Sequence, residues 1–482
     1  MTYNNSYHCP LYRTATLILG AAICLPVANA GLVSIQARPP LVEPPFCESA
    51  TSIQARPPLP KPPYCSPASD MAPKLASPPT RASGLPVISD NGRYVSYISN
   101  IVRQHGEQQR DQIFLWDNQT QQRHLISQDN EKDPDKQGEG NSLYPAISGD
   151  GSRVVYATDA RDIDPVCGDG QMNIYMRIWD QMKTSDCISK PQSLPFGSPS
   201  LAMSTLPAIS GDGQTVSWAS NMTNQVEGDA NGYTDVFVWT NDAGIRLASV
   251  ATDGTQGNGP SSKSSLDQTG QRLVFMSEAS NLVSGDANKA SDIFLRNLNE
   301  EKTILVSLSS TGEPGNQFSA GPMISRDGQH VVFLSKATNL VPGDTNDKLD
   351  VFVRHLATGT TERVSVADGN SGIEANGNSA YAAITGNGRC VVFQSQATNL
   401  VTGDANGQDD IYVRDLLTQH TTRLSLGRGK REANDDSFFP AISADGTTVA
   451  YTSNATRLTA GGDSKSNDPD VYIQRLPSGL CR

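Results

Sequence analysis

The sequence MISRDGQHVVFLS, residues 323–335, contains the pattern that decides the fold. Two apolar runs flank the pair Asp327-Gly328, and Asp-Gly between such runs is a strong signal for a β-hairpin. A third strand is predicted from Asp350, where the run Asp-Val-Phe-Val begins, and a fourth over residues 363–366. Four short strands joined by polar turns predict an antiparallel meander.

This unit recurs seven times over residues 85–482, with its turn glycine 57 to 62 residues from the next. One meander cannot bury both of its faces, so the units must stack, and closing the stack into a ring protects the strand edges. We therefore predict an all-β fold, a seven-bladed β-propeller. The seven turn glycines are Gly92, Gly151, Gly213, Gly270, Gly328, Gly388 and Gly446.

The repeats resemble the WD-like repeats of the TolB-type propellers. The resemblance depends on the Ser-x-Asp-Gly turn and on the strand that reads Asp, hydrophobic, aromatic, and it extends over residues 85–482. It implies the propeller fold, whereas function depends on the site that a fold carries. TolB itself has an α/β domain before its propeller, and this chain has a Pro-rich segment there instead.

Residues 1–30 have the features of an export signal. An apolar stretch too short to span a bilayer follows Arg13, and Ala28-Asn29-Ala30 is a small-x-small cleavage site. Lipid attachment at Cys24 is the alternative, although Ile23 makes a poor lipobox. We therefore expect a periplasmic or secreted protein after cleavage near Ala30.

Residues 31–84 are Pro-rich, and the octapeptide at 34–41 recurs 18 residues later at 52–59. So much proline favours an extended linker. The seventh repeat ends after its third strand, at 470–474, without an outer strand. Because both duplicated segments resemble a fourth strand, we predict that one copy closes the ring in blade 7. A plain linker is the alternative.

Six cysteines follow residue 30. An even number in an exported chain favours disulfides over metal ligation, and the sequence contains no CxxC pair that would indicate zinc. We expect Cys390 to be exposed, because other repeats have Arg, His, Thr or Tyr at its position. The pairings that fit are Cys167 with Cys187, Cys47 with Cys65, and Cys390 with Cys481.

The formal net charge of −12 argues against a nucleic-acid partner, since phosphate binding needs clustered Lys and Arg. After residue 30 no segment is apolar enough to cross a membrane. We predict a monomeric, non-catalytic binding or scaffold protein of the cell envelope or exterior. Its expected partner is an envelope protein, a peptide or a glycan.

The alternative is a propeller enzyme. A serine peptidase is disfavoured because the sequence has no GxSxG motif, and His330 and His355 occupy positions that hold unrelated residues in other repeats. A carboxylate-based glycoside hydrolase or lyase stays open, since Asp is plentiful in the loops. We predict no catalytic residue.

Four successive repeats carry Asp-x-Asn-x-x-x-Asp between their second and third strands, and we expect these loops to share a face with the links between blades. Hard oxygen ligands at alternate positions suit Ca²⁺, with weak affinity because the distal Glu of an EF-hand is missing. Alternatively, the loop is turn chemistry, with the last Asp accepting backbone N–H bonds as Asp111 would in blade 1. The candidate ligands are Asp229, Asn231, Asp235; Asp286, Asn288, Asp292; Asp344, Asn346, Asp350; Asp404, Asn406, Asp410.

Overall fold

The structure is a computed structural model, and all regular elements in the described residues are β-strands. The export signal, both copies of the duplicated octapeptide, Cys47 and Cys65 lie outside these residues. The structure describes residues 73–76, 82–101, 110–128, 138–164, 167, 170–180, 185–190, 203–369, 371–427, 429–459 and 468–481.

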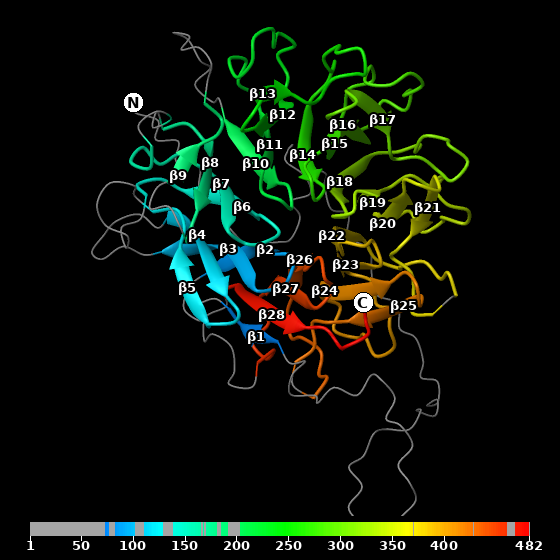
Figure 1. The fold of residues 1–482 in the computed structure, drawn as a ribbon. Coiled ribbons are helices and arrows are strands. Elements are labelled where there is room, and N and C mark those ends of the chain that lie inside the picture. Colours follow the sequence, from blue (N-terminus) through cyan, green and yellow to red (C-terminus); the bar gives the residue numbers. More distant parts are fainter. Residues whose placement is uncertain are drawn as a thin grey trace, which may run out of the picture. The chain divides into compact units, whose positions relative to one another are not determined.

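The strands form seven four-stranded antiparallel sheets, and each sheet packs against the next until the seventh meets the first. Figure 1 shows the first strand of each blade innermost. The all-β, seven-bladed prediction is confirmed. The strands of blades 1 to 7 in chain order are β2 (Ser83–Ile88), β3 (Tyr94–Ile101), β4 (Arg110–Asp117), β5 (Gln122–Leu125); β6 (Ser142–Ile147), β7 (Arg153–Thr158), β8 (Asn173–Ile178), β9 (Ser185–Cys187); β10 (Ser204–Ile209), β11 (Thr215–Ser220), β12 (Asp235–Thr240), β13 (Gly244–Leu247); β14 (Ser261–Leu266), β15 (Arg272–Ser277), β16 (Asp292–Asn297), β17 (Lys302–Leu305); β18 (Ser319–Ile324), β19 (His330–Ser335), β20 (Asp350–His355), β21 (Thr360–Arg363); β22 (Ser379–Ile384), β23 (Cys390–Ser395), β24 (Asp410–Asp415), β25 (His420–Arg423); β26 (Ser437–Ile442), β27 (Thr448–Ser453), β28 (Asp470–Arg475), with β1 (Lys74–Leu75) outermost in blade 7.

An N-terminal strand closes the ring in blade 7, as predicted. Lys74 and Leu75 of β1 pair with Ile473 and Tyr472 of β28. The prediction that a copy of the octapeptide forms this strand is wrong, because β1 begins after both copies. The two residues of β1 are enough to close the ring, because the outer edge of β28 is the one edge of blade 7 that they pair with.

The Ser-x-Asp-Gly turn closes the first hairpin of blade 2 as the sequence predicts. The Ser148 hydroxyl donates to Asp150 at 2.6 Å, and the Asp150 carboxylate accepts the Ser152 N–H at 2.9 Å. Gly151 has φ of 78°, a left-handed conformation that glycine adopts without steric cost. The Gly149 N–H then donates to the Gly211 carbonyl of blade 3 at 2.8 Å, so these turns also join neighbouring blades.

Aromatic residues on the second and third strands stack within each blade. Phe333 and Phe352 are fully buried, with ring centroids 5.9 Å apart. Burying a side chain of this size stabilises the fold by about 1.5–3 kcal/mol. The other six pairs are Tyr97 with Phe114, Tyr156 with Tyr175, Trp218 with Phe237, Phe275 with Phe294, Phe393 with Tyr412, and Tyr451 with Tyr472.

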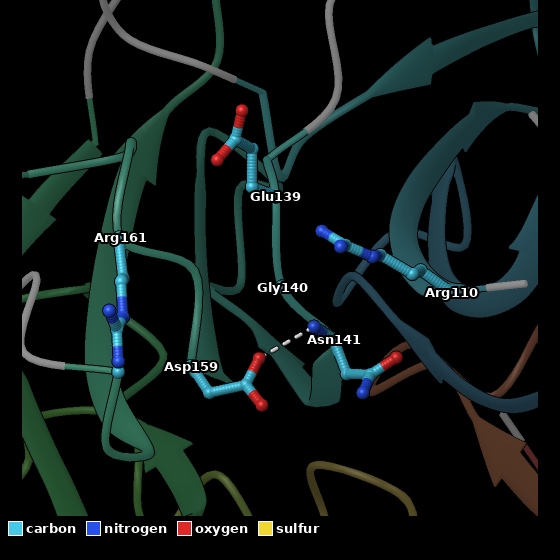
Figure 2. Close-up of a pocket in the computed structure, with 7 residues that line it drawn as sticks. Arg110, Glu139, Gly140, Asn141, Asp159 and Arg161 are labelled. Atoms are coloured by element: carbon cyan, nitrogen blue, oxygen red, sulfur yellow. Dashed lines mark hydrogen bonds between the residues drawn. The ribbon is translucent and has the colours of Figure 1, made fainter. Parts of the chain in front are cut away.

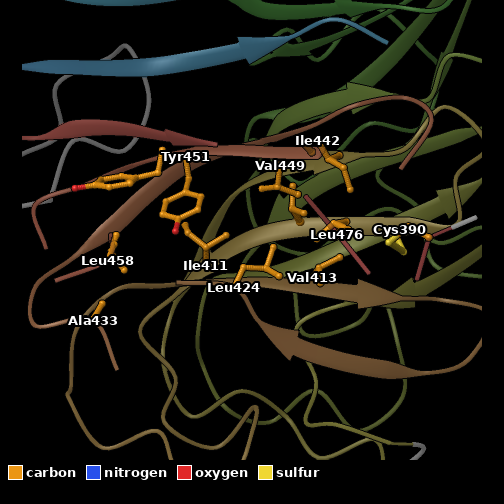
Figure 3. Packing of buried hydrophobic residues seen from close by; sticks show 14 of the residues in the cluster. Cys390, Ile411, Val413, Leu424, Ala433, Ile442, Val449, Tyr451, Leu458 and Leu476 are labelled. Carbon is orange, nitrogen blue, oxygen red and sulfur yellow. A yellow bond between two sulfur atoms is a disulfide. The ribbon is translucent and has the colours of Figure 1, made fainter. Parts of the chain in front are cut away.

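The apolar core lies between the blades. Figure 3 shows the layer between blades 6 and 7, where Ile411 and Val413 of β24 pack in one cluster with Ile442 and Val449 of blade 7. Corresponding clusters occur at other blade contacts. Because each blade buries its faces against two neighbours, the loops at the rim are free to differ.

Two of the predicted disulfides are present, Cys167–Cys187 in blade 2 and Cys390–Cys481 between β23 and the chain after β28. Their loops of 20 and 91 residues correspond to about 3 and about 5 kcal/mol in the chain-entropy description. The expectation that Cys390 is exposed is wrong. It is fully buried, because its side chain faces the layer between blades 6 and 7.

Each innermost strand contains a bulge that the sequence did not reveal. In blade 4 the register of β14 against β15 shifts between Ser262 and Ser265, and Lys263 within the bulge has φ of 49°. Other blades have a left-handed residue at the same place, although leucine, tyrosine and phenylalanine rarely adopt it. These residues are Leu85, Tyr144, Leu206, Gly321, Tyr381 and Phe439.

Candidate functional site

The connections between second and third strands and the links between blades lie on one face of the ring, as predicted; we call it the loop face. In blade 3 the Asn231 side-chain amide donates at 3.1 Å to the carbonyl of Gly257, which belongs to the link to blade 4. The asparagine therefore ties two loops together. The corresponding donors and carbonyls are Asn288 and Gly315, Asn346 and Ala375, and Asn406 and Ala433.

Each of these asparagines also donates to the aspartate that begins the third strand, at 2.7 Å for Asn231 and Asp235. The other oxygen of Asp235 accepts the Ser249 hydroxyl at 2.6 Å. The last Asp of each triplet is thus held by side-chain donors rather than by the backbone N–H groups that the sequence suggested. The corresponding serines are Ser307, Ser365 and Ser425.

Blade 1 fills this position with Gln112, not with Asp111 as expected. Gln112 pairs with Ser99 on β3 at the place where Asp235 pairs on β11, and its side-chain oxygen accepts the Ser127 hydroxyl at 2.7 Å. The prediction fails because β4 begins two residues before Gln112, whereas β12 begins at the equivalent residue, Asp235.

In blade 5 an arginine at the end of the fourth strand enters the acidic loop. The Arg363 Nη1 lies 3.2 Å from Asp344 Oδ1, 3.9 Å from Asp350 Oδ2 and 2.6 Å from Glu374 Oε1. The arginine side chain is 7% exposed, so its charge is balanced within the protein. A buried guanidinium therefore stands between the first and last aspartates of the triplet.

Blade 6 repeats this arrangement. The Arg423 Nη1 lies 3.1 Å from Asp404 Oδ1, 3.2 Å from Asp410 Oδ2 and 2.9 Å from Glu432 Oε1. Its Nη2 donates to the Gly403 carbonyl at 3.0 Å. The surrounding carboxylates raise the pKa of Arg423 above its usual value, although burial opposes them.

Blades 3 and 4 contain the same carboxylate pairs without the arginine. Leu247 pairs with Phe237 where Arg363 pairs with Phe352, and Leu305 occupies this position in blade 4. The glutamate is replaced as well, by Gln256 in blade 3 and Pro314 in blade 4. Aligning the fourth strands of the repeats would have revealed this contrast.

Burial has the largest effect on the pKa of these carboxyl groups. It raises the pKa of Asp229 to about 6, and the neighbouring Asp235 adds to the effect. It also raises the pKa of Asp292 to about 6, against hydrogen bonds from Ser307 and Asn288. Burial raises the pKa of Asp344 to about 6 too, because the Arg363 charge only partly offsets it.

A polar pocket of about 340 Å³ opens on the loop face between blades 1 and 2. Figure 2 shows Arg110 and Arg161 on opposite sides of it, with Glu139 and Asp159 also at its wall. Asp159 Oδ1 accepts the backbone N–H of Asn141 at 2.6 Å, while the Arg110 Nη1 is buried and no described residue accepts a hydrogen bond from it. The pocket could not be predicted from the repeats, because the repeated motifs contain none of its charged residues.

The side-chain hydrogen bonds and ion pairs of the described histidines join them to other histidines or to carboxylates. His330 and His355 approach Nδ1 to Nδ1 at 2.7 Å, and the His355 Nε2 lies 2.8 Å from Glu362 Oε1. Burial lowers the pKa of His330, and His355 adds to this effect. His420 contacts Asp368 at 2.9 Å. This arrangement does not provide the Ser-His-Asp constellation of a serine hydrolase.

Taken together, the fold and these loops define a seven-bladed propeller whose blades carry different chemistry on one face. The structure is similar to "Oligogalacturonate lyase in complex with manganese", at 12% identity and TM-score 0.52, covering 86% of this chain and 96% of that one. It also matches a putative TolB from Agrobacterium tumefaciens, at 12% identity and TM-score 0.39, covering 83% and 99%. The propeller fold that the TolB-type resemblance implied is confirmed by the seven four-stranded sheets, and the likeness to the lyase agrees with it.

A prolyl endopeptidase matches at 12% identity and TM-score 0.48, and this chain covers 51% of it. No family model matches the chain, and no curated protein does. At 12% identity the likeness to the lyase concerns the fold alone and leaves the activity open.

Over the residues that the structure describes, no helix is long and apolar enough to cross a membrane. In the same residues, no three His, Cys, Asp or Glu side chains gather as a metal-binding group. The two disulfides are consistent with an extracytoplasmic protein.

Proposed function

We propose that this protein is a non-catalytic, extracytoplasmic binding protein that holds a carboxylate-bearing ligand in the pocket between blades 1 and 2. The observation that carries the proposal is the Arg110 guanidinium, whose Nη1 is buried at the pocket and has no hydrogen-bond partner among the residues that the structure describes. A buried donor without a partner is costly, and a ligand oxygen would relieve that cost.

Two guanidinium groups and two carboxylates line the pocket, and among the described residues the Arg110 guanidinium keeps a donor that a small anionic group could pair. Arg110 and Arg161 both line it, and guanidinium groups recognise carboxylates through paired hydrogen bonds. Glu139 stands nearby and suits a ligand hydroxyl or amide, as in a uronic-acid oligosaccharide or a short acidic peptide. In blades 3 to 6 the Asn side chains of the loop face brace neighbouring loops, whereas the pocket lies in blades 1 and 2, where this repeated pattern is absent.

The test is calorimetric titration of the full chain with trigalacturonate and with a tri-glutamate peptide, using neutral maltotriose for comparison. We expect an acidic probe to bind, and the Arg110→Ala/Arg161→Ala double variant to lose at least tenfold in affinity. Arg457→Ala is the matched control, because Arg457 is exposed in the corresponding loop of blade 7.

Equal affinity of the wild type and the double variant for the acidic probes would contradict the proposal, as would absence of binding to both. Cleavage of trigalacturonate by the wild-type chain would favour the enzymatic alternative instead.

A further inference from the structure

We infer that blades 3 and 4 each bind one Ca²⁺ ion, at the carboxylate pairs Asp229 with Asp235 and Asp286 with Asp292, where blades 5 and 6 place an arginine. The site lies in different blades from the pocket of the proposed function and does not depend on it.

The first observation is that the same carboxylate pair already holds a cation in two sister blades. In blade 6 the Arg423 Nη1 lies 3.1 Å from Asp404 and 3.2 Å from Asp410, so the two carboxylates converge on one positive charge. In blades 5 and 6 a guanidinium therefore lies at the place that the sequence analysis assigned to calcium. Since Leu247 and Leu305 carry no charge, blades 3 and 4 need their cation from solvent.

The second observation concerns Asp229. Its Oδ1 is buried and has no hydrogen-bond partner in the described part of the chain, whereas Asp235 is fully buried and held by Asn231 and Ser249. A carboxylate oxygen that is desolvated without a donor is costly. A metal ion between the two carboxylates would provide the missing partner.

The ligand set is smaller than the sequence suggested. Asn231 points its amide nitrogen at Asp235, and its oxygen accepts the Tyr233 N–H at 2.9 Å, so Asn231 is a brace rather than a ligand. Asn288 is arranged in the same way toward Asp292 and Ala290. Each site thus offers two carboxylates, whose charge matches one divalent cation.

Calcium fits this environment better than magnesium. Asp229 and Asp286 are partly exposed, so water can complete the coordination shell. Ca²⁺ accepts irregular shells of 6 to 8 oxygens, whereas Mg²⁺ demands a near-ideal octahedron. Two carboxylates and water give weak binding, with a Kd on the order of 10⁻⁴–10⁻³ M, as in extracellular modules.

The experiment is calorimetric titration of the chelator-treated full chain with CaCl₂, together with elemental analysis after dialysis in millimolar calcium. We expect two ions per wild-type chain, one in Leu247→Arg and none in Leu247→Arg/Leu305→Arg, because the new guanidinium would fill each site. Leu125→Arg is the matched control. Leu125 pairs with Phe114 at the same position of blade 1, and blade 1 lacks the acidic triplet, so two ions should remain.

If an arginine variant does not fold, the isosteric Asp229→Asn and Asp286→Asn variants decide, each losing one ion. A wild-type chain without bound calcium at millimolar concentration would overturn the inference. So would two ions in the Asp229→Asn/Asp286→Asn chain, or tighter binding of Mg²⁺ than of Ca²⁺.

Discussion

Blades 5 and 6 share the Asp-x-Asn-x-x-x-Asp loop with blades 3 and 4, yet only blades 5 and 6 neutralise its negative charge with an arginine. In blades 5 and 6 a buried arginine contacts both aspartates, and in blades 3 and 4 a leucine stands at that position. The Asn and Ser braces are the same in all four. Residues that recur in all four of these blades therefore build the loop, and the residues that vary decide what it can hold.

Removing the internal cation should have the largest effect. In Arg423→Leu the carboxylates of Asp404 and Asp410 remain buried without their guanidinium, and breaking a buried pair costs about 3–5 kcal/mol. We expect denaturant unfolding to show a loss of this size at neutral pH in the presence of chelator.

The exposed Arg457→Leu serves as the control and should change stability by less than about 0.5 kcal/mol. If the acidic loop can be neutralised either by an arginine or by Ca²⁺, adding calcium should restore part of the stability that Arg423→Leu loses. A loss as small as that of the control would show that Arg423 does not balance the acidic loop.

A pH experiment tests the raised pKa of the buried aspartates, which the blade pairs share, and the response to calcium, which should distinguish them. The pKa of Asp229 is about 6 in the folded protein, and the group therefore binds protons more strongly there than in the unfolded chain. Protonated Asp229 therefore adds to the free energy of unfolding at low pH. This stabilisation is lost as the pH rises through 6, and we expect a decrease of about 1 kcal/mol between pH 5 and 7.

We expect this loss to disappear in Asp229→Asn when stability is measured at both pH values with chelator. Asp344→Asn in blade 5 should remove a loss in the same direction, since burial raises the pKa of Asp344 to about 6 as well. Added calcium should suppress the loss from Asp229 and leave that from Asp344. An equal response of both groups to calcium would remove the distinction between the blade pairs.

Most of the fold could be predicted because its determinants are local and repeated. The turn around Asp327-Gly328 and the aromatic strand after it specify a hairpin in each blade, and the missing strand of the seventh repeat requires closure from the N-terminus. The identity of the closing strand could not be predicted, since the two residues of β1, Lys74 and Leu75, have no distinctive pattern. The burial of Cys390 depends on packing between blades, which a single repeat does not reveal.

The candidate sites were harder to predict for a different reason. The triplets were found from spacing, but whether Asn231 acts as a ligand or a brace depends on which atom of its amide faces Asp235. The ion pairs of Arg363 join residues from three separate segments of the chain. The pocket at Arg110 is built from residues that break the repeat, and a method that searches for repetition passes over them.

The smallest predicted effect lies on the innermost strands, where blades 4 and 5 again differ at one position. Lys263 has φ of 49° in the bulge of β14, and Gly321 has φ of 60° in the bulge of β18. A left-handed conformation costs a residue with a side chain about 1 kcal/mol or more, and the exposed Lys263 side chain gains little packing in return. We expect Lys263→Gly to stabilise the protein by about 0.5–1 kcal/mol in denaturant unfolding, and Lys263→Ala to give no such gain because it keeps the strain.

The reciprocal Gly321→Lys variant should lose a similar amount of stability. The nearest atom to a Cβ added at Gly321 is Leu334 Cδ1 at 3.4 Å, so the cost is conformational rather than steric. If Lys263→Gly and Lys263→Ala have the same stability, the left-handed bulge is not strained, and the two blades differ there only in their side chains.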